Sequence, residues 1–573
     1  MFASSDRSPR LWSRSSGDPA ECNELYGARE TTLDAWCQGP MGIGHGMPHW
    51  RHAHEANGDR MSKDTTYDVI VIGSGMGGMA TATALSRMDR KVLLLEQAQN
   101  IGGLTHTFSR EGFSWDVGLH YCGTFRPDQS AGVALEWLSG GAIEFRSVGT
   151  VYDTLHFPDG FEIAVGRPAE AFKMELKDRF PDNSPEVDAY FEALESGDEA
   201  LRARSTERSM PEPFSSALGW WNRRKIQRFC GRTTSEVIAD CVSSPKLASV
   251  LSAQWGTYGG VPDKASFGVH AAVMSHYLDG ASYPEGGASA IARGLVPVIE
   301  SAGGRALAAN PVDEILIEDG AAVGVRTESG EEYRAPVIVS AIGAGETVKR
   351  LLPPEVREQP WAKEIAGLNP SICHFEVYLG FKGDISKHGG TRSGHWFHES
   401  WDPGDFLWTD LDAPIPGCYA SFPSLKDRSH DPGPSNRHTG QFMVLADWST
   451  VAEFADGGAK ERPEAWAALK KNVETKMLDF YKQRFPALAE LIVYHELGTP
   501  LATAAFTAHS KGAFYGLETT PRRILSDALS PRTPVPGLFL SGQDAMVPGI
   551  AGSLWGGLLC AGAIDPRAFK RLG

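Results

Sequence analysis

Two short apolar runs near the start of the chain predict buried parallel strands. They are Tyr67–Ile72, which ends at Gly73, and Lys91–Leu95, which ends at Glu96. Met76–Met88 lies between them, is rich in Ala, Met and Leu, and contains no Pro, which is typical of a crossover helix. Strands that are apolar throughout are buried on both faces, and the unit has the length of about 30 residues that a βαβ motif requires. We therefore expect the chain to open with a nucleotide-binding α/β fold.

The pattern changes twice further along the chain. Val151–Val165 predicts a hairpin around Pro158-Asp159-Gly160, and the stretch from Pro168 to Gly280 is mostly helical in pattern. Sheet-building sequence then returns, with a predicted helix at Ala288–Ala302 and strands at Pro311–Ile317, Ala321–Thr327 and Val337–Ala341. A second excursion contains predicted strands at His374–Phe381 and Gln441–Trp448, a polar loop at Lys426–Gly440 and a helix at Pro463–Phe485. A strand at Leu538–Ser541 and a helix at Ala551–Lys570 complete the predicted elements.

Charge and composition exclude some classes of function. The chain has 573 residues, with 55 Lys and Arg against 71 Asp and Glu, so its formal net charge is −16. Nucleic acids are held mainly by clustered cations, so we expect no nucleic-acid partner. The eight Cys residues are scattered without a Cys-x-x-Cys pair or zinc-ligand spacing, which argues against a structural metal and a disulfide framework. Val69–Leu85 and Gly549–Ile564 are apolar but shorter than the roughly 20 residues of a membrane-spanning helix.

The segment Gly73-Ser74-Gly75-Met76-Gly77-Gly78 fits the pattern G-x-G-x-x-G between the first strand and the helix. The first Gly of this motif makes a tight turn, the second lets the backbone approach a pyrophosphate, and the third lets the helix pack on the sheet. The helix N-terminus adds N–H groups and the positive end of its dipole. Glu96 follows about 20 residues on, where a carboxylate accepts from ribose hydroxyls and disfavours a phosphorylated ribose. The motif therefore predicts FAD or NAD rather than NADP.

A second glycine pair decides between these cofactors. Gly102-Gly103 follows Glu96 closely and leads into Leu104-Thr105-His106, and further on into Gly118-Leu119-His120-Tyr121. FAD-dependent enzymes place such a pair beside the flavin and its ribityl chain, where the backbone lies close to the ligand. FAD is therefore the expected cofactor.

These segments resemble the superfamily of phytoene desaturases, carotenoid isomerases and retinol saturases, and within it the branch of all-trans-retinol 13,14-reductases. The resemblance spans about Tyr67 to Arg571. It implies that the backbone of Val312 meets the adenine, and that the Asp544 side chain and the helix after Gly549 hold ribityl and phosphate groups. Many relatives carry Arg where this chain has Leu104, and His106 is the residue that could take over its polar role. The predicted cofactor-binding residues are Gly73, Gly75, Met76, Gly77, Gly78, Glu96, Gly102, Gly103, Leu104, Thr105, His106, Val312, Gly542, Asp544, Gly549, Ile550 and Gly552.

The fold class that follows is α/β: an FAD-binding Rossmann-like domain of the glutathione-reductase type with an inserted α+β substrate or cap domain. We expect the FAD-binding domain to comprise residues 65–150, 281–346 and 501–573, and the cap to comprise 151–280 and 347–500. Residues 1–64 are expected to be a disordered or dispensable N-terminal extension.

The chemistry is expected to belong to the flavin, because no Ser/His/Asp elbow, metal cluster or Cys redox pair is evident in the sequence. Saturating a C=C bond requires hydride at one carbon and a proton at the other, so an acid must lie within reach. Candidate proton donors are His120, Tyr121 and His276, with His270 and Tyr277 as further candidates. Packing or ordinary hydrogen bonding explains each of these residues more readily than proton donation does, since a His or Tyr partly buried beside a cavity needs no catalytic reason.

No second G-x-G-x-x-G motif follows, and we interpret Gly343-Ala344-Gly345-Glu346 as an ordinary turn. NAD(P)H therefore has no dedicated domain. Two routes for electrons stay open: a transient visit of NAD(P)H to the flavin, or another redox partner.

Residues 218–229 combine two Trp with a cluster of cations in a strongly acidic chain. Such a segment suits docking on an anionic lipid surface, although a solvated helix face with Trp in the cap core would give the same pattern. The partner expected from the resemblance is a hydrophobic small molecule. We expect a cytoplasmic protein that is peripheral on the inner membrane surface, and the sequence leaves its oligomeric state open.

The preferred function is reduction of a C=C bond in a retinoid-like or carotenoid-like polyene. Carotenoid desaturation or isomerisation on the same scaffold is the first alternative, and flavin-dependent amine oxidation is the second. A remote alternative is a prenyl-protein escort that uses this fold without redox chemistry. The intact glycine motif and Asp544 argue against the escort, since a protein without FAD has no need of them.

Overall fold

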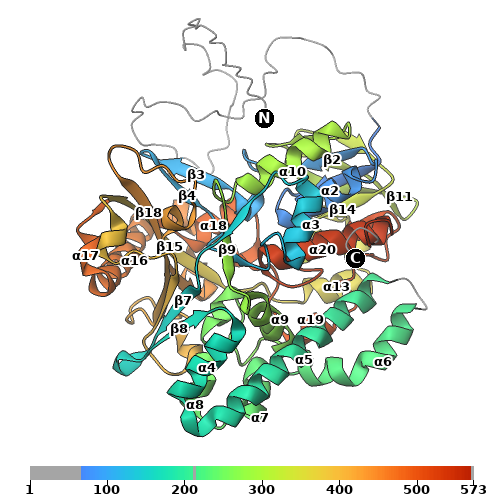
Figure 1. Cartoon of the computed structure of the whole chain (residues 1–573). Coiled ribbons are helices and arrows are strands. Elements are labelled where there is room, and N and C mark those ends of the chain that lie inside the picture. The colour runs from blue at the N-terminus through green and yellow to red at the C-terminus, as the bar shows by residue number, and fades with distance from the viewer. Residues whose placement is uncertain (1–65, 211–213, 570–573) are drawn as a thin grey trace, which may run out of the picture. The chain divides into compact units, whose positions relative to one another are not determined.

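A computed structural model describes residues 66–210 and 214–569, with side chains from Leu218 onward in the second range. The predicted extension 1–64 lies outside the described residues. Three bodies of secondary structure are visible in Figure 1: a parallel sheet with its helices, a larger mixed sheet, and a group of helices beneath them.

A five-stranded parallel sheet is assembled from strands far apart in the chain. Its order is β10 (Arg305–Leu307), β2 (Val92–Leu95), β1 (Val69–Ile72), β14 (Ile338–Ser340) and β20 (Leu538–Leu540). In its register Ile72 lies opposite both Leu95 and Ser340, and Ser340 lies opposite Leu540. The carboxyl ends of the strands are therefore aligned at one edge of the sheet.

Both faces of this sheet are covered, which explains why its strands are apolar throughout. Val69 and Val71 point into a core with α2 (Met76–Ser86), α3 (Ser130–Ser139), α10 (Ala290–Ser301) and α20 (Gly549–Ile564). Ile70 and Ile72 point into a second core with α13 (Pro360–Ala366) and an antiparallel sheet of β11 (Val312–Glu318), β12 (Ala321–Thr327) and β13 (Glu332–Arg334). This layering confirms the predicted α/β fold class.

A seven-stranded mixed sheet forms the second body. Its order is β19 (Ile492–Gly498), β15 (Cys373–Lys382), β18 (Arg437–Ala446), β17 (Gly417–Ser421), β16 (Gly394–His398), β7 (Val151–His156) and β8 (Glu162–Gly166). The β7–β8 hairpin joins the other strands through a parallel β16–β7 pair, and every other pair is antiparallel. One face packs Phe375, Val377 and Val444 against α16 (Pro463–Arg484), which lies outside the sheet in Figure 1. The two segments predicted for the cap thus share one sheet, while their exact boundaries stay a prediction.

Helices α4 to α9 form the third body. They are α4 (Ala169–Arg179), α5 (Ser184–Ser209), α6 (Phe214–Phe229), α7 (Thr234–Cys241), α8 (Pro245–Ser252) and α9 (Phe267–Tyr277). The smaller strands are β3 (Thr107–Arg110), β4 (Phe113–Asp116), β5 (Cys122–Gly123), β6 (Phe145–Ser147) and β9 (Ala281–Pro284). The short helices are α11 (Ala344–Glu346), α12 (Pro354–Arg357), α14 (Pro423–Lys426), α15 (Gly458–Glu461), α17 (Pro486–Ala489), α18 (Pro500–Thr507) and α19 (Pro521–Leu525).

Four predicted segments differ from the structure. The polar loop at Lys426–Gly440 is wrong at both ends, because Lys426 ends α14 with 2% exposure and β18 begins at Arg437. β18 then ends at Ala446 rather than Trp448, and the last helix ends at Ile564 rather than Lys570. The turn predicted at Gly343–Glu346 is the start of a helical segment, which begins with α11 and continues to Leu351.

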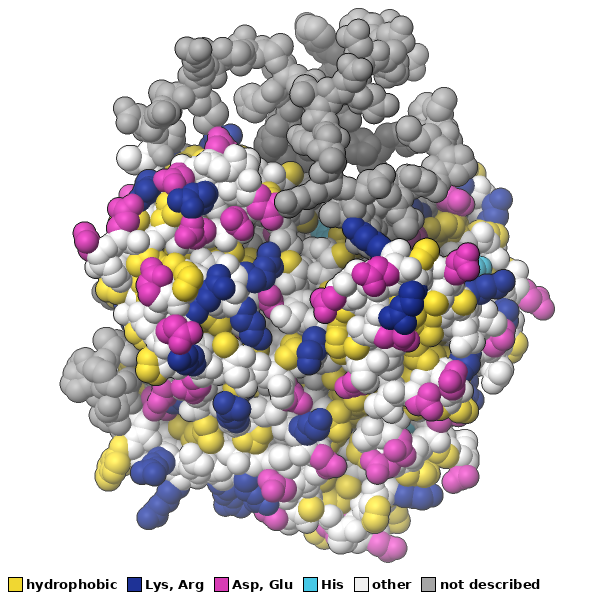
Figure 2. Space-filling model, turned by 180° about the vertical axis from the view of Figure 1, so that it is seen from behind, with side chains coloured by type: hydrophobic (Ala, Val, Ile, Leu, Met, Phe, Trp, Pro, Cys, Tyr) yellow, Lys and Arg dark blue, Asp and Glu magenta, His cyan; other side chains and the backbone are white. Residues whose placement is uncertain are grey.

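The surface of the described part carries both signs of charge. Lys and Arg side chains are interspersed with Asp and Glu on the face drawn in Figure 2. Cations gathered on one face would be needed to hold a nucleic-acid backbone.

Candidate functional site

The predicted nucleotide-binding residues meet at the carboxyl edge of the parallel sheet. Gly73 follows β1, Glu96 follows β2, Gly343 follows β14, and the segment from Ser541 to Asp544 follows β20. In open α/β sheets this edge, where the strand order changes direction, is where ligands bind. The register of the strands therefore brings together residues that lie up to about 470 positions apart in the chain.

The glycine turn has room on one side and close packing on the other. A Cβ atom at Gly75 would find no protein atom within 4 Å. A Cβ at Gly77 would collide with the backbone of Gly542, and one at Gly78 with the carbonyl of Gly73. No side chain caps α2, and its first turn has no acidic residue. Gly77 and Gly78 are thus needed for packing, whereas the open space at Gly75 and the uncapped helix suit an approaching pyrophosphate.

Glu96 fastens the strand end to the glycine turn. Its Oε2 accepts hydrogen bonds from the Ser74 backbone N–H at 2.9 Å and from the Ser74 hydroxyl at 2.6 Å, and its Oε1 accepts from the backbone N–H of Ala98 at 2.8 Å. Two carboxylate oxygens offer about four lone-pair sites. One acceptor position is therefore left for a ribose hydroxyl.

The second glycine pair lies against the first motif. The N–H of Gly102 donates to the Ser74 hydroxyl at 2.9 Å, and a Cβ at Gly103 would lie 2.9 Å from Gly75 Cα. Thr105 and His106 are held locally: the Thr105 hydroxyl donates to the carbonyl of Gly102 at 2.7 Å, and His106 Nδ1 lies 2.5 Å from the carbonyl of Gly103. His106 is therefore engaged by its own loop.

Leu104 connects this loop to the segment that carries His120 and Tyr121. A Cβ at Gly118 would lie 3.1 Å from the Leu104 carbonyl oxygen and 3.2 Å from its Cβ. The two segments consequently run in direct contact, and the residues after Gly118 lead from the glycine loop toward the seven-stranded sheet.

The C-terminal residues close the site from the other side. Asp544 is 3% exposed, its Oδ2 accepts from the Ala344 N–H at 2.8 Å, and its Oδ1 accepts from the Leu517 N–H at 3.0 Å. Gly549 and Ile550 are partly exposed at the start of α20, where no side chain caps the helix. A Cβ at Gly552 would collide with the Val547 carbonyl, so Gly552 serves the fold. Asp544 thus ties three loops together, and a ribityl contact by it stays a prediction.

Val312 lies beside the loop after β2. The N–H of Asn310, two residues before it, donates to the Glu96 carbonyl at 2.8 Å. This proximity agrees with a Val312 backbone near the adenine, although the contact itself stays a prediction. The glycine turn, the acidic residue and the C-terminal turn all adjoin one another, so the residues present fit an FAD molecule.

The inner face of the seven-stranded sheet is polar and aromatic, in contrast to its apolar outer face. Residues opposite one another in a sheet share a face, and here Asp153 pairs with Gly394, and Tyr419 pairs with both Trp396 and Met443. The same face carries His374 and Glu376 of β15, Tyr378, Gln441 and Ser421. In the described residues, eighteen buried side-chain nitrogen and oxygen atoms have no hydrogen-bond partner, and seven of them lie on this face or on His120. The seven atoms are both ring nitrogens of His120 and one atom each of Asp153, His374, Glu376, Tyr419 and Gln441. Buried polar groups are nearly always satisfied, so this concentration indicates a face that contacts a ligand.

His120 is the sequence candidate that faces this surface. Its ring lies 5.1 Å from the Tyr419 ring, and neither ring nitrogen has a hydrogen-bond partner. Burial, with the charge of Lys426 as the next cause, lowers the pKa of His120 to about 3. The imidazole is therefore neutral, and it can accept or donate one hydrogen bond to a bound molecule.

Tyr121 belongs to a buried network. Its hydroxyl donates to Asp153 Oδ2 at 2.5 Å, and Gln254 Nε2 and Trp396 Nε1 donate to the same oxygen at 2.6 Å and 2.8 Å. The Lys426 ammonium group lies 5.0 Å from the Tyr121 ring centroid. Burial raises the pKa of Asp153 and lowers the pKa of Lys426.

The two candidates on α9 have structural partners. His276 Nδ1 bonds the Thr124 hydroxyl at 2.6 Å and its Nε2 accepts from the Gly123 N–H at 3.0 Å, and burial lowers its pKa to about 4. His270 is bonded by the hydroxyls of Tyr190 and Tyr258. Both nitrogens of each ring are occupied, so we assign these histidines to packing rather than to proton donation.

An apolar pocket opens beside the network. It is lined by aromatic and aliphatic side chains with one amide: Tyr152, Val165, Phe172, Tyr190, Phe191, Leu194, Val250, Leu251, Gln254, Met274, Tyr277 and Leu278. Tyr277, the last sequence candidate, stacks on Tyr152 at 5.5 Å and meets Tyr121 edge-on at 5.3 Å. Ligand pockets combine such apolar walls with a few polar groups, which here are Gln254 and the carboxylate behind it.

Sequence reasoning missed Asp153 and Lys426. Asp153 lies in a predicted hairpin strand, and Lys426 begins the polar stretch predicted to be a loop. The sequence does contain a signal for Asp153: it is a charged residue in the middle of the apolar strand VYDTLHF. Buried strands rarely carry a charged residue there. No comparable signal marks Lys426.

Comparison with known proteins gives the following matches. Residues 76–435 match the family model described as flavin containing amine oxidoreductase. The chain is 30% identical to an all-trans-retinol 13,14-reductase of Danio rerio over 87% of this chain and 86% of the relative, and 31% identical to an inactive all-trans-retinol 13,14-reductase of the same species over the same shares. It is 26% identical to a chloroplastic prolycopene isomerase 1 of an Oncidium hybrid cultivar, over 86% and 83% of the two chains. Among solved structures, cyclohexylamine oxidase from Brevibacterium oxydans superposes with a TM-score of 0.56 at 18% identity, over 88% and 99% of the chains. The resemblance noted from the sequence is thereby confirmed.

Proposed function

We propose a function for this chain, which belongs to the family of flavin-containing amine oxidoreductases. It is an FAD-dependent enzyme that reduces a C=C bond of a hydrophobic polyene, retinoid-like or carotenoid-like. The observation that carries this proposal is 30% identity to an all-trans-retinol 13,14-reductase over 87% of this chain. A relative named inactive is equally similar, so activity requires its own measurement.

Different groups of residues would bind the cofactor and the substrate. The bound flavin supplies the hydride. Gly75, Glu96 and the loop at Gly102–His106 would hold its nucleotide and ribityl parts, with the C-terminal turn opposite. The apolar side chains around Tyr152 and Tyr277 would contact the hydrocarbon. The neutral His120 ring, with its two free nitrogens, would orient a polar group of the substrate or the cofactor.

Amine oxidation is the competing function that the family name raises, and spectroscopy of the flavin separates the two. The holoenzyme, reduced anaerobically with dithionite, should be reoxidised by all-trans-retinol or a carotenoid, with a product two hydrogens heavier. The oxidised enzyme should stay oxidised in the presence of cyclohexylamine and putrescine. Bleaching of oxidised flavin by an amine, with no response of reduced flavin to any polyene, would overturn the proposal.

The same experiment covers the alternatives on this scaffold. A desaturase would instead transfer electrons from the polyene to oxidised flavin, and an isomerase would change the polyene geometry without net change in flavin. A purified protein that takes up no FAD would indicate a non-catalytic escort. Anaerobic addition of NADPH or NADH to the oxidised holoenzyme then tests the electron source: flavin reduction supports transient NAD(P)H binding, and no reduction indicates another redox partner.

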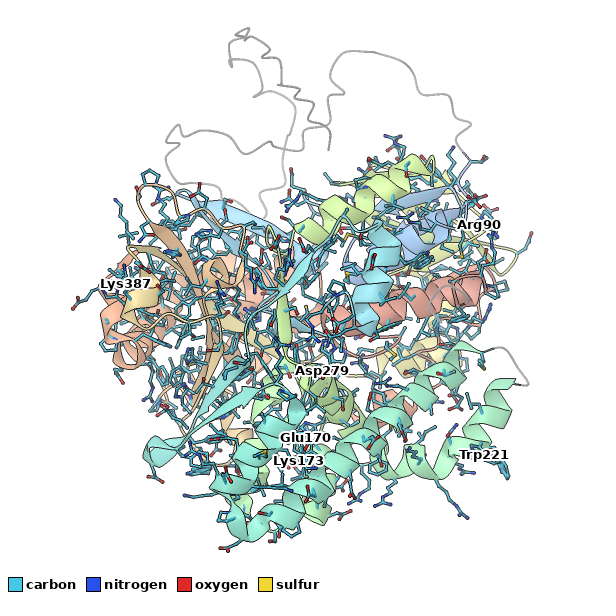
Figure 3. All side chains as sticks on the ribbon, viewed as in Figure 1. Arg90, Glu170, Lys173, Trp221, Asp279 and Lys387 are labelled. Carbon is cyan, nitrogen blue, oxygen red and sulfur yellow. The ribbon has the colours of Figure 1, made fainter. Side chains whose placement is uncertain are left out.

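The membrane contact predicted for residues 218–229 has an exposed aromatic surface on α6. Trp220 and Trp221 are 76% and 78% exposed, and Trp221 projects outward in Figure 3. Arg223 and Arg224 are exposed beside them, whereas Lys225 forms an ion pair with Glu199. Indole rings settle at the lipid headgroup level and cations attract anionic lipids. Within the described residues no helix is long and apolar enough to cross a bilayer, so the contact we propose is peripheral.

Liposome flotation tests this contact. The variant Trp220→Ala/Trp221→Ala and the variant Arg223→Glu/Arg224→Glu should each lose most of their binding to vesicles containing phosphatidylserine. Lys225 is left unchanged because reversing it would repel Glu199. The control Lys264→Glu/Lys471→Glu changes the net charge equally at two exposed sites for which the described part of the chain supplies no ion-pair partner, and it should float like the wild type. Equal flotation of all four proteins would contradict the contact.

A further inference from the structure

Four polar side chains on the inner face of the seven-stranded sheet have unused hydrogen-bonding capacity. His374 and Glu376 lie on β15 and Gln441 lies on β18, and the His120 ring contacts Tyr419 on the same face. Five of their buried atoms have no partner within the described chain: both ring nitrogens of His120, His374 Nδ1, Glu376 Oε2 and Gln441 Oε1. Buried polar atoms are rarely left unsatisfied, because each one costs free energy. Such a concentration indicates a surface that binds a polar group.

These four side chains, the polar cluster, adjoin one another. Gln441 Nε2 donates to Glu376 Oε1 at 2.9 Å, and His374 Nε2 lies 3.7 Å from Glu376 Oε2. Burial is the main cause of the lowered pKa of His120, the charges of Lys426 and His374 add to it, and a hydrogen bond with Gln441 opposes them. Neighbours shift a pKa only at short range. His374 and Gln441 therefore both lie near the His120 ring.

The polar cluster adjoins the second glycine loop. Gln441 Nε2 also donates to the Asp116 carbonyl at 2.7 Å, so the segment that continues from Asp116 passes next to the cluster. Along this segment Gly118 touches Leu104, and His120 follows two residues later. The cluster thus begins where the loop expected to lie along the flavin ends.

On its other side the polar cluster reaches the C-terminal turn. The His374 ring packs edge-on against Phe514, with the ring centres 4.6 Å apart. A Cβ at Gly516, two residues after Phe514, would collide with Asp544 Oδ1. The His374 side chain keeps 11% of its surface exposed, and His120 is also partly exposed. A molecule bound between the glycine loop and the C-terminal turn can therefore touch the cluster.

Acceptors outnumber donors among the unpartnered atoms. Gln441 Nε2 faces two acceptors, which fixes the orientation of the amide and leaves Oε1 as a free acceptor. Glu376 Oε2 is a second free acceptor. A neutral imidazole has one donor and one acceptor nitrogen, so His120 supplies a third acceptor and one donor. His374 Nδ1 adds at most one more donor. The polar cluster is therefore suited to a group that donates hydrogen bonds.

The cation beside the polar cluster is engaged by other groups. The Lys426 ammonium group donates to the His120 carbonyl at 3.0 Å and to the Ser421 hydroxyl at 2.7 Å. It also lies 5.0 Å from the centre of the Tyr121 ring. We therefore assign it no contact with a group bound at the cluster.

We propose that the polar cluster binds a hydroxyl end group of the polyene and selects it over a carbonyl or carboxylate end group. The inference rests on the proposed function and narrows its substrate class. A hydroxyl can donate and accept at once, so it can donate to Glu376 or Gln441 and accept from His120. An aldehyde oxygen or a carboxylate only accepts, so binding it would leave the oxygens of Glu376 and Gln441 unsatisfied, which weakens binding.

Two observations favour the substrate over the flavin ring as the source of this donor. The pyrimidine edge of a flavin carries one N–H between two carbonyl groups, so it needs mainly donors from the protein, and the cluster offers mainly acceptors. A row of contacting rings also joins His120 through Tyr419 and Tyr121 to Tyr152, with centres 5.1, 6.3 and 5.7 Å apart. Tyr152 belongs to the apolar side chains proposed to contact the hydrocarbon. Adjoining surfaces can thus hold the chain and its end group.

Retinoids that differ only in their end group test the proposal on the oxidised holoenzyme. Equilibrium dialysis should show that the wild type binds all-trans-retinol at least about 10-fold more tightly than all-trans-retinal. Glu376→Gln should bring this ratio to about one. Gln441 Nε2 still holds the oxygen of the new amide, so its NH₂ group takes the place of Oε2 and donates to the aldehyde. All-trans-retinoic acid should likewise bind more tightly to Glu376→Gln than to the wild type.

Met443→Leu is the matched control. Met443 lies opposite Glu376 in the register of β15 and β18, and the replacement nearly conserves volume without changing any hydrogen-bonding group. Its alcohol-to-aldehyde ratio should equal that of the wild type. If Glu376→Gln does not fold, His120→Phe carries the test, since it keeps a ring beside Tyr419 but removes both nitrogens, and it should lose most of the preference for the alcohol.

Equal affinity of the wild type for alcohol and aldehyde, as expected if only water occupies the polar cluster, would overturn the inference. An unchanged ratio in Glu376→Gln would also overturn it, and a shifted absorption spectrum of the ligand-free flavin in that variant would assign the cluster to the cofactor. Reduced holoenzyme that reacts with retinol but shows no preference for the alcohol contradicts the inference alone. Failure of every retinoid to bind or react would overturn the proposed function together with it.

Discussion

Buried histidines in this protein are kept neutral by their surroundings. His270 is 0% exposed, and the hydroxyls of Tyr190 and Tyr258 lie 2.9 Å and 3.1 Å from its two ring nitrogens. Burial lowers the pKa of His270 to about 3. In the unfolded chain the same side chain titrates near 6.5. As pH falls below that value the unfolded state binds the proton first, so stability is lost between pH 6.5 and the folded-state pKa.

Replacing His270 by Gln should flatten this acid dependence. Gln keeps hydrogen-bonding groups at the site but does not titrate. Between pH 6.5 and about 3 the unfolding free energy of His270→Gln should fall less steeply than that of the wild type, by up to about 1.4 kcal/mol per pH unit. Urea unfolding across this range measures the slope. The exposed His388→Gln control should keep the wild-type slope, and an identical slope in His270→Gln would contradict the assignment.

Residue roles could be predicted from sequence where the chemistry is local. The glycines of Gly73–Gly78 act within one turn, so their pattern alone indicates an anion site. Asp153 owes its setting to Trp396 and Gln254, which lie 243 and 101 residues away. Strand register brings Trp396 to Asp153, and the packing of the turn Ala253–Thr257 against the sheet brings Gln254 there; the sequence displays neither.

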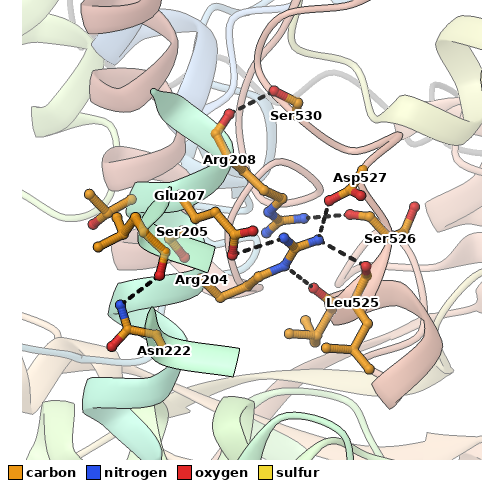
Figure 4. Close-up of polar contacts among 12 residues, drawn as sticks. Arg204, Ser205, Glu207, Arg208, Asn222, Leu525, Ser526, Asp527 and Ser530 are labelled. Carbon is orange, nitrogen blue, oxygen red and sulfur yellow. Dashed lines mark hydrogen bonds and ion pairs between the residues drawn. The ribbon is translucent and has the colours of Figure 1, made fainter. Parts of the chain in front are cut away.

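A pair of arginines on α5 attaches this helix to the end of α19 and to the segment that follows it. Arg204 donates to the carbonyls of Ile524 and Leu525 and to the carboxylate of Asp527, at 3.2, 2.8 and 2.6 Å (Figure 4). One turn further along, the Ser530 hydroxyl donates to the Arg208 carbonyl at 2.8 Å. The helix therefore holds the chain that leads into β20 and the C-terminal turn.

Breaking this attachment should destabilise the protein. Arg204→Met leaves two carbonyl groups without donors, which costs about 2 kcal/mol or more of unfolding free energy. Asp527→Asn is the matched control, because its side chain is 89% exposed and an exposed ion pair contributes less than about 1 kcal/mol. Chemical denaturation of both variants measures the difference. Equal stabilities would show that the ion pair, rather than the carbonyl contacts, makes the attachment.

Helices and strands could be predicted from the sequence where a single apolar pattern continues along the whole element. The strands of the parallel sheet satisfy this because both of their faces are buried. β18 does not, since it begins with Arg437-His438-Thr439 and places Gln441 on a polar inner face. A strand with a polar inner face has the composition of a loop, and this is why the predicted loop Lys426–Gly440 runs past the start of β18.

At the scale of the whole described molecule, the site forms where two sheets approach through one short segment. Gly118–Tyr121 connects the glycine loop at Leu104 with the carboxylate at Asp153. The sequence predicted the cofactor side of this arrangement through the glycine motifs. It could not predict the polar face of the seven-stranded sheet, because that face combines strands from two separated parts of the chain.

The central claim is that these segments converge on one bound flavin, and Gly75 tests it most directly. Gly75 has φ −59°, which any residue adopts, and a side chain there would meet only open space in the protein itself. Gly75→Asp should therefore fold like the FAD-free wild type, with the same thermal midpoint, yet place a negative side chain where the pyrophosphate binds. The measurement is bound FAD per chain after gel filtration: the account predicts about one for the wild type and none for Gly75→Asp. A colourless wild type, or full FAD occupancy in Gly75→Asp, would contradict it.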